Sequence, residues 1–197
     1  NRVKNLDFVD VTDAELDNAT YEAAEKQFVQ NNTDKAIEGF EKYTEQFPNG
    51  LHATKANFYL AQSYFSKGET QKTIPYYEFV LQTERNEYTE QALARLAQVF
   101  LETDSYTKAI PVLKRLEESA DFPQNITFAQ SNLMKANYEL KSYAQAVSYA
   151  EKVLANEKVD DRIKSDAHVI IARSAIATND EDKAKEAYVE VQKIAKA

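Results

Sequence analysis

The sequence predicts an all-α fold, an α-solenoid of about five helical hairpins and therefore about ten helices. The first observation is composition, because 43% of the 197 residues are hydrophobic but only 3 are Gly and 4 are Pro. A fold rich in strands and turns would lack its usual turn residues. The second observation is a recurring pair of small residues. Ala24 and Ala36 are 12 positions apart, and the same step of 12 occurs four more times.

The recurring pair divides the chain into five repeats. Its members are Ala24 with Ala36, Ala61 with Thr73, Ala97 with Ala109, Met134 with Ala146, and Ala172 with Ala184. The second members follow one another at intervals of 36 to 38 residues, a period typical of stacked repeats. One helical hairpin cannot bury both of its apolar faces alone, so each needs a neighbour. We expect one domain, 13–197, with repeats at about 13–50, 51–86, 87–123, 124–159 and 160–197, after an N-terminal extension, 1–12.

The first hairpin is predicted from apolar residues at helical spacing. Ala24 and Phe28 indicate a helix over about 13–30, and Ala36 and Phe40 indicate a second helix that ends near Pro48. Asn31 and Asn32 lie between the two helices and form a turn that tolerates left-handed backbone.

The four later hairpins follow the same plan. They cover about 51–84, 87–119, 124–156 and 160–196, with bends expected at Gly68, Asp104–Ser105, Lys141–Ser142 and Asn179–Asp180. Pro75 and Pro111 occupy equivalent places, expected near the first turn of a helix, where few backbone donors lose a partner. The last helix has apolar residues on one side and charged residues elsewhere, which is typical of a terminal cap.

These residues resemble the tetratricopeptide repeat (TPR) family. The resemblance rests on the small residue of each first helix, the Ala of each second helix, and an aromatic residue four positions later. Such aromatic residues are Phe40, Tyr77 and Tyr188, and Pro48 closes the first repeat. Met134, Thr73 and Tyr43 depart from the family pattern by replacing small residues. The resemblance covers roughly 17–197 and implies a right-handed α-solenoid whose first helices line a concave groove.

The spacing between repeats is longer than in the family consensus, with FPNG between the first two. In its repeat spacing the chain resembles bacterial cell-envelope members of the family, such as the Tol-Pal-associated periplasmic protein and the lipoprotein of the outer-membrane assembly machine. This resemblance implies a location in the bacterial cell envelope or periplasm. A cytoplasmic location is the alternative.

Charge and hydropathy restrict the partners. A net charge of −8 and a pI near 5.0 give a surface that repels phosphate backbones, so we expect no nucleic-acid partner. No apolar run approaches the roughly 18 residues needed to cross a bilayer, so we expect no direct membrane insertion of this segment. The chain has no Cys, which excludes disulfides, thiolate metal sites and thiol catalysis.

Catalytic motifs are absent from the sequence. His52 and His168 are far apart, and neither stands in a spacing that places two metal ligands on one helix face. No Gly-rich phosphate loop or nucleophile elbow occurs, and acidic pairs such as Glu117 and Glu118 are expected to be solvated. We therefore expect a protein that is not an enzyme and has no metal or cofactor.

The candidate site is the groove that the resemblance places along the first helices. Residues three or four apart share a helix face, so the residue after each small position and its neighbours at those offsets should face the groove. The groove candidates are Tyr21, Glu25, Phe28, Phe58, Gln62, Phe65, Gln98, Leu101, Lys135, Tyr138 and Arg173, with Ala94, Ser131, Val169 and Ile176 completing the rows. Their middle column changes from acidic Glu25 to basic Lys135 and Arg173.

Two interpretations of the groove residues stay open. They bind a peptide or protein segment through aromatic anchors and matched charges, or the aromatic residues pack against the next hairpin. The first predicts a non-catalytic protein-interaction scaffold, whose partner the sequence does not identify. The alternative function is a small-ligand or glycan-binding module, because Tyr and Phe faces can stack on apolar ligand surfaces.

Overall fold

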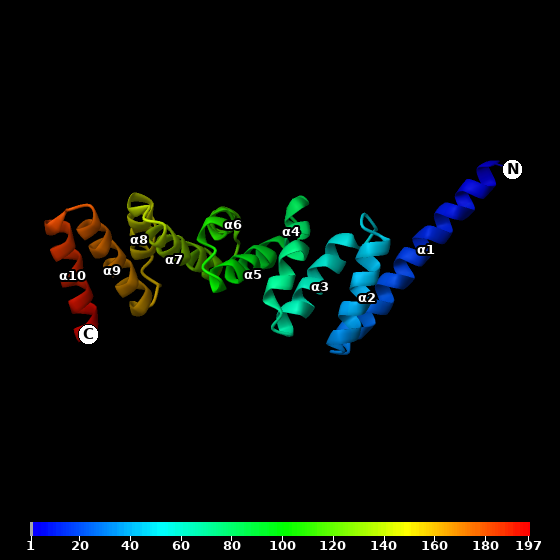
Figure 1. The fold of residues 1–197 in the computed structure, drawn as a ribbon, viewed down its shortest axis with the longest axis horizontal. Helices are drawn as coiled ribbons and strands as arrows, with labels where there is room; N and C mark the ends of the chain where they lie inside the picture. The colour runs from blue at the N-terminus through cyan, green and yellow to red at the C-terminus, as the bar shows by residue number, and fades with distance from the viewer. Residues whose placement is uncertain (1) are drawn as a thin grey trace. The chain divides into compact units, whose positions relative to one another are not determined.

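The computed structural model describes residues 2–197, with side chains from Asp13 onward, and the described residues form no strand. The expected extension, 1–12, therefore lies outside the residues described in full. The described residues form ten α-helices and one 3₁₀ turn: α1 (Arg2–Val29), α2 (Thr33–Gln46), α3 (Ala53–Ser66), η1 (Thr70–Thr73), α4 (Ile74–Gln82), α5 (Thr89–Glu102), α6 (Tyr106–Ser119), α7 (Pro123–Glu139), α8 (Tyr143–Ala155), α9 (Asp161–Ala177) and α10 (Glu181–Lys196). The all-α prediction is confirmed (Figure 1).

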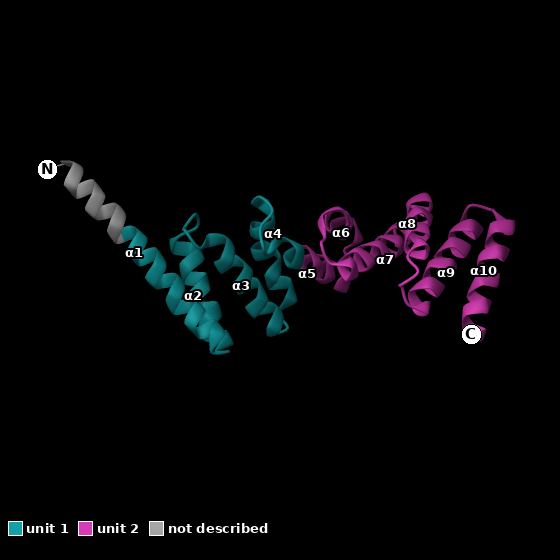
Figure 2. Cartoon of the chain, turned by 180° about the vertical axis from the view of Figure 1, so that it is seen from behind, with its two compact units in different colours: residues 1–92 teal, residues 93–197 magenta. Residues whose placement is uncertain are grey.

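The chain divides into two compact units, residues 1–92 and residues 93–197 (Figure 2). In the first unit α1 packs on α2, α2 on α3, and α3 on α4. In the second unit α6 packs on α7, α7 on α8, α8 on α9, and α9 on α10. Within each unit these helices therefore pack against their neighbours in sequence, as expected for stacked hairpins. No helix in the described part of the chain is both long and apolar enough to cross a membrane.

All five predicted bends contain a residue in the left-handed region. These residues are Asn31, Gly68, Asp104, Lys141 and Asn179, with φ between 52° and 82°. After each of them the next backbone N–H donates to the carbonyl five residues earlier, for example Ser142 to Asn137 at 2.8 Å. The left-handed residue itself donates to the carbonyl three residues earlier, as Lys141 does to Tyr138. This pair of bonds is the Schellman motif, which satisfies carbonyls that would be free at a helix end.

The two prolines differ in their surroundings. Pro75 lies at the start of α4, as expected, because the preceding residues form the 3₁₀ turn η1. Pro111 lies inside α6, since that helix already begins at Tyr106. The expectation that both prolines occupy a first turn is therefore wrong for Pro111.

The core of the first unit is built around aromatic residues and small residues. Phe40 and Tyr43 on α2 are fully buried, together with Ala36 and Leu60. Gly39 lets α1 and α2 approach closely, because a Cβ at this position would lie 2.8 Å from the Cβ of Ala24.

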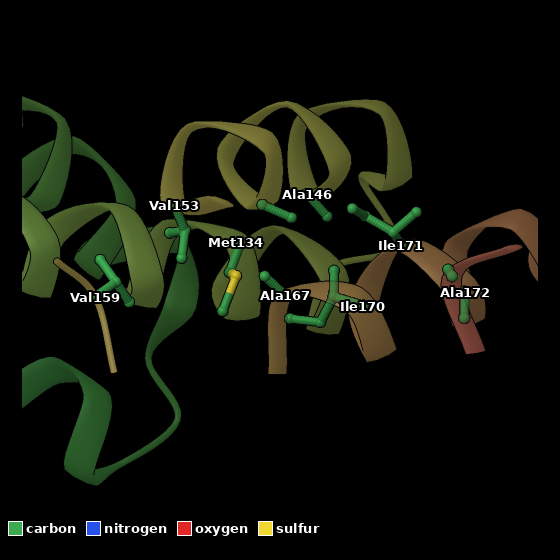
Figure 3. Packing of buried hydrophobic residues seen from close by; sticks show 10 residues of the cluster. Met134, Ala146, Val153, Val159, Ala167, Ile170, Ile171 and Ala172 are labelled. Atoms are coloured by element: carbon green, nitrogen blue, oxygen red, sulfur yellow. The ribbon is translucent and has the colours of Figure 1, made fainter. Parts of the chain in front are cut away.

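The core of the second unit is aliphatic. Figure 3 shows Met134 of α7 beside Ala167 and Ile170 of α9, with Ala146 and Val153 of α8 in the same cluster. The unbranched thioether side chain of Met134 occupies the position held by Ala in the other repeats and is fully buried. All ten small-position residues predicted from the sequence are buried.

Candidate functional site

The start of α3 is fixed by a buried network. Asp17 on α1 is 5% exposed and accepts a hydrogen bond of 2.6 Å from the Tyr43 hydroxyl and one of 2.9 Å from the backbone N–H of Leu51. The Tyr43 oxygen in turn accepts from the backbone N–H of His52 at 2.9 Å. Buried polar groups are stable only when they are hydrogen-bonded, so this network determines where α3 begins relative to α1 and α2.

Aromatic side chains connect α1 with α3 across the hairpins. Tyr21 stacks on the ring of His52 with 4.2 Å between centroids, and Phe28 stacks on Tyr59 with 4.4 Å. Phe58 stacks on Tyr88, just before α5, with 4.6 Å. All three pairs are stacked, with interplanar angles of 12°, 12° and 27°, which stabilises the contact between successive hairpins.

Lys55 lies at the centre of these rings. Its Nζ is 3.3 Å from Glu25 Oε2, 5.8 Å from the Tyr21 ring centroid and 5.6 Å from the Tyr59 centroid. The side chains of Lys55 and Glu25 are 38% and 34% exposed. We call the partly exposed residues Glu25, Phe28, Lys55, Tyr59 and Gln62 the α1–α3 surface. It combines apolar rings, one charge of each sign and an amide within one compact unit.

Three groups at or beside this surface, Tyr21, Glu25 and Tyr88, have shifted pKa values. Burial, and then a hydrogen bond to Glu25, raise the pKa of Tyr21 far above its ordinary value of 10. The same hydrogen bond from Tyr21, assisted by Lys55, lowers the pKa of Glu25. Burial likewise raises the pKa of Tyr88. At neutral pH Tyr21 and Tyr88 are therefore neutral donors, and Glu25 is an anion.

A cavity of about 450 Å³ adjoins the α1–α3 surface. It lies between the start of α3 and the connection to α5, and is lined by Leu51, His52, Thr54, Lys55 and residues 83–88. The lining therefore combines one exposed apolar side chain, Leu51, with charged and aromatic groups. A volume of this size is within the range of small-ligand sites.

The second unit contains a related but less aromatic arrangement. Lys135 on α7 and Asp166 on α9 form an ion pair of 3.2 Å, with both side chains nearly half exposed. The ring of Tyr138, one turn after Lys135, lies near the ring of Tyr143, with 5.9 Å between the two centroids. Arg173 on α9 is exposed.

The predicted groove residues fall into two classes. Tyr21 and Phe58 are only 3% and 5% exposed, and their contacts with His52 and Tyr88 match the second interpretation, packing on the next hairpin. The other nine keep a partly or largely exposed side chain: Glu25, Phe28, Gln62, Phe65, Gln98, Leu101, Lys135, Tyr138 and Arg173. Contact of any of them with a partner stays a prediction.

Sequence reasoning missed Lys55, Tyr59 and Tyr88. Lys55 and Tyr59 are four residues apart and Gln62 follows three residues later, so all three share one face of α3. Because Gln62 was already assigned to the groove, this spacing could have identified Lys55 and Tyr59 as well. Phe58 was assigned to the groove instead. Tyr88 precedes α5 and carries no such signal. Among residues with described side chains, no three His, Asp or Glu lie close enough together to hold a metal ion.

Stacked two-helix hairpins with small residues at their contacts define a helical-repeat protein. The chain belongs to the tetratricopeptide repeat-like domain family, which matches residues 9–126. The family resemblance is thereby confirmed, whereas the similarity to cell-envelope members stays a prediction. No match was found among curated proteins.

Solved structures share the fold at low sequence identity. A crystal structure of MamA superimposes with a TM-score of 0.63 at 17% identity, covering 92% of this chain and 93% of that one. MamA from Desulfovibrio magneticus gives 0.60 at 14% identity, with 91% and 95% covered. YrrB, described as a TPR protein with an unusual peptide-binding site, gives 0.65 at 17% identity, with 89% and 84% covered. At these identities the similarity concerns the fold.

Proposed function

We propose that this protein is a non-catalytic interaction scaffold that binds a peptide or protein segment on the first helices of its hairpins. The observation that carries the proposal is the α1–α3 surface, where Lys55, paired with Glu25, lies within 6 Å of two aromatic rings and remains over a third exposed. The membership in the TPR-like family and the peptide-binding site of YrrB support this class of function.

Binding would use the exposed parts of the surface. The outer parts of Phe28 and Tyr59 offer apolar area, while Glu25 and Lys55 offer one anion and one cation to the backbone or side chains of a segment. The stacking of Phe28 on Tyr59 holds both rings in place before binding, which lowers the entropy cost of ordering them. Tyr21 and Phe58 support this surface from beneath.

The proposal is tested with peptides selected from a random display library against the full chain. Affinities are measured by fluorescence anisotropy for the wild type, Tyr59→Ala and Lys55→Ala. We expect each variant to weaken binding about tenfold, the loss typical of one anchor residue. Tyr149→Ala is the matched control, since Tyr149 is also a half-buried tyrosine near a lysine but lies on α8. Equal affinities for all four proteins would contradict the proposal.

The alternative, a small-ligand or glycan-binding module, is favoured by the cavity of about 450 Å³ beside Tyr88. Tyr88 could stack on an apolar ligand face, and Lys55 lines the same space. Calorimetric titration with a panel of saccharides and metabolites tests it. Saturable binding that is lost in Tyr88→Ala, without any peptide binding, would favour this alternative over the scaffold.

For the compartment we propose the bacterial cell envelope, on the resemblance of the repeat spacing alone. Fractionation of the native cells, followed by immunodetection of this protein, tests the proposal. Recovery in the periplasmic or envelope fraction is the expected result, and recovery with cytoplasmic markers would favour the alternative.

A further inference from the structure

We propose that a second binding site, for a neutral carboxamide side chain such as that of Asn or Gln in a partner segment, lies between α8 and α9. The site is a cavity of about 250 Å³ lined by Tyr143, Ala144 and Val147 of α8, Ser174 and Thr178 of α9, and Lys183 of α10. It lies wholly within the second compact unit and does not depend on the α1–α3 surface.

The first observation is a buried hydroxyl that lacks a partner. Ser174 is 1% exposed, and its Oγ has no hydrogen-bond partner among the described residues. Ser63 occupies the equivalent position in the second repeat, two residues after the small residue, and its hydroxyl donates to the backbone carbonyl of Tyr59 at 2.7 Å. A buried polar group without a partner is destabilising, so its presence in the wall of a cavity points to a ligand that satisfies it.

The second observation is the start of α8 at the same cavity. Ser142 precedes the helix but its side chain makes no capping hydrogen bond, and Ala144, in the first turn, lines the cavity. The first backbone N–H groups of a helix have no intrahelical acceptors. Together with the Ser174 hydroxyl they provide donors for a carbonyl oxygen.

Acceptors lie on the opposite side. Asp180 lines the cavity and caps α10 by accepting from the backbone N–H of Lys183 at 3.2 Å, which leaves its second carboxylate oxygen available for a further donor. The Thr178 oxygen can also accept, because its own proton is directed to the carbonyl of Ser174. The cavity thus presents both donors and acceptors.

Size and charge select the ligand class. The cavity is lined by one anion, Asp180, and one cation, Lys183, so the charges of its side chains balance. The starts of α8 and α10 and the end of α9 meet there, and Asp180 already caps the start of α10. A full charge on the ligand would gain little from such surroundings, whereas a carboxamide supplies one acceptor and two donors without charge. A volume of about 250 Å³ is below the range for whole small-molecule ligands and suits a single side chain, with Val147 and Ala144 beside its methylene groups.

The test uses N-acetylglutamine N-methylamide as the ligand probe, with the corresponding glutamate, lysine and methionine compounds in parallel. Each is titrated into the isotope-labelled full chain, and the backbone amide signals of residues 143–147 and 174–178 are followed by NMR. We expect the glutamine compound to shift these signals in a saturable way. The other three compounds should bind at least fivefold more weakly.

Two serine variants distinguish the loss of a ligand contact from a general effect of the substitution on the fold. Ser174→Ala removes the buried hydroxyl and should weaken binding of the glutamine compound about fivefold, which corresponds to one neutral hydrogen bond. Ser63→Ala, at the equivalent position, should leave binding unchanged because its hydroxyl is bonded to its own helix. The proposal is overturned if no compound shifts these signals, if a charged compound binds as well, or if Ser174→Ala binds like the wild type.

Discussion

Glu25 and Lys55 form an ion pair of 3.3 Å between α1 and α3. Lys135 and Asp166 form one of 3.2 Å between α7 and α9. Glu25 and Lys135 each follow the small residue of a first helix, whereas Lys55 and Asp166 each lie six residues before the next small residue. The same two repeat positions therefore carry an ion pair with exchanged charges.

The first prediction is that the Glu25–Lys55 pair also tolerates exchange. Lys55→Glu and Glu25→Lys should each lower the free energy of unfolding by about 0.5 to 1 kcal/mol, because like charges then face each other at a partly exposed site. The double variant should be more stable than the sum of the two losses predicts, because opposite charges face each other again. The Tyr21 hydroxyl, which donates to Glu25 in the wild type, does not regain that acceptor. Urea denaturation of the four proteins measures the coupling.

High salt provides the control for this cycle, since screening weakens exposed charge pairs. The coupling energy should fall as salt is raised to about 1 M, where the screening length is about 3 Å. Purely additive losses at low salt would show that the 3.3 Å contact contributes nothing to stability.

The second prediction concerns the contact between α1 and α2. Gly39→Ala should lower the free energy of unfolding by about 1 to 3 kcal/mol, because the added Cβ would lie 2.8 Å from Ala24 Cβ and 3.1 Å from its Cα. At an open helical position the same change stabilises by roughly 0.5 to 1 kcal/mol, so the expected sign is opposite. In an Ala24→Gly background the nearest atom is gone, and the cost of Gly39→Ala should shrink. A stabilising Gly39→Ala would contradict this explanation.

The third prediction concerns the network at the start of α3. Tyr43→Phe removes the donor to buried Asp17 and the acceptor for the backbone N–H of His52. Leaving both groups short of a partner should cost about 2 to 3 kcal/mol in urea denaturation. Tyr106→Phe is the matched control, since its hydroxyl also donates to a carboxylate, that of Asp104, but at an exposed site and should cost less than about 0.5 kcal/mol. Equal costs would contradict the role assigned to burial.

The fold was predictable from the sequence because repetition multiplies weak signals. A single pair such as Ala24 and Ala36 indicates little, but five pairs at one spacing indicate the buried contacts, and all ten residues are buried. The same register predicted the bend at Lys141, although Lys has no preference for the left-handed region. At this bend the packing of the hairpin imposes the left-handed conformation, although the residue is a lysine.

The surface was less predictable, because residues adjacent in the sequence differ by about 100° around the axis of a helix. Phe58 was assigned to the groove and is buried, whereas Tyr59 is partly exposed on the α1–α3 surface. The hydrogen bond between Asp17 and Tyr43 joins residues 26 positions apart and depends on how the hairpins cross. The helical period alone contains no information about that crossing.

The fourth prediction concerns the bends. Lys141 has φ 60°, a conformation that costs a non-glycine residue roughly 1 kcal/mol, so Lys141→Gly should raise the free energy of unfolding by about that amount. Gly68 has φ 82° and no atom within 4 Å of an added Cβ, so Gly68→Ala should cause a similar loss from the backbone alone. Thermal unfolding measures both. A destabilising Lys141→Gly would show that the lysine side chain contributes more than its strained backbone costs.

The fifth prediction is a pH dependence from His168 on α9. Its ring lines a cavity with Leu154, Ile171 and Val189, and burial lowers its pKa below the ordinary value of 6.5, while Glu190 acts weakly in the opposite direction. The unfolded chain therefore binds a proton at this residue more readily than the folded chain. The contribution of His168 to the free energy of unfolding is therefore fully present above pH 6.5. It should decrease as the pH falls through 6.5 toward the lower pKa of the folded state.

The variant His168→Gln keeps a polar side chain of similar size but cannot titrate. Urea denaturation at intervals from pH 7.5 to pH 5 should show a shallower loss of stability for this variant than for the wild type, because the linkage term of one proton is missing. Glu190→Gln in the wild-type background should steepen the loss slightly, since the carboxylate favours the charged imidazole. Identical pH profiles for His168→Gln and the wild type would show that the ring is equally solvated in both states.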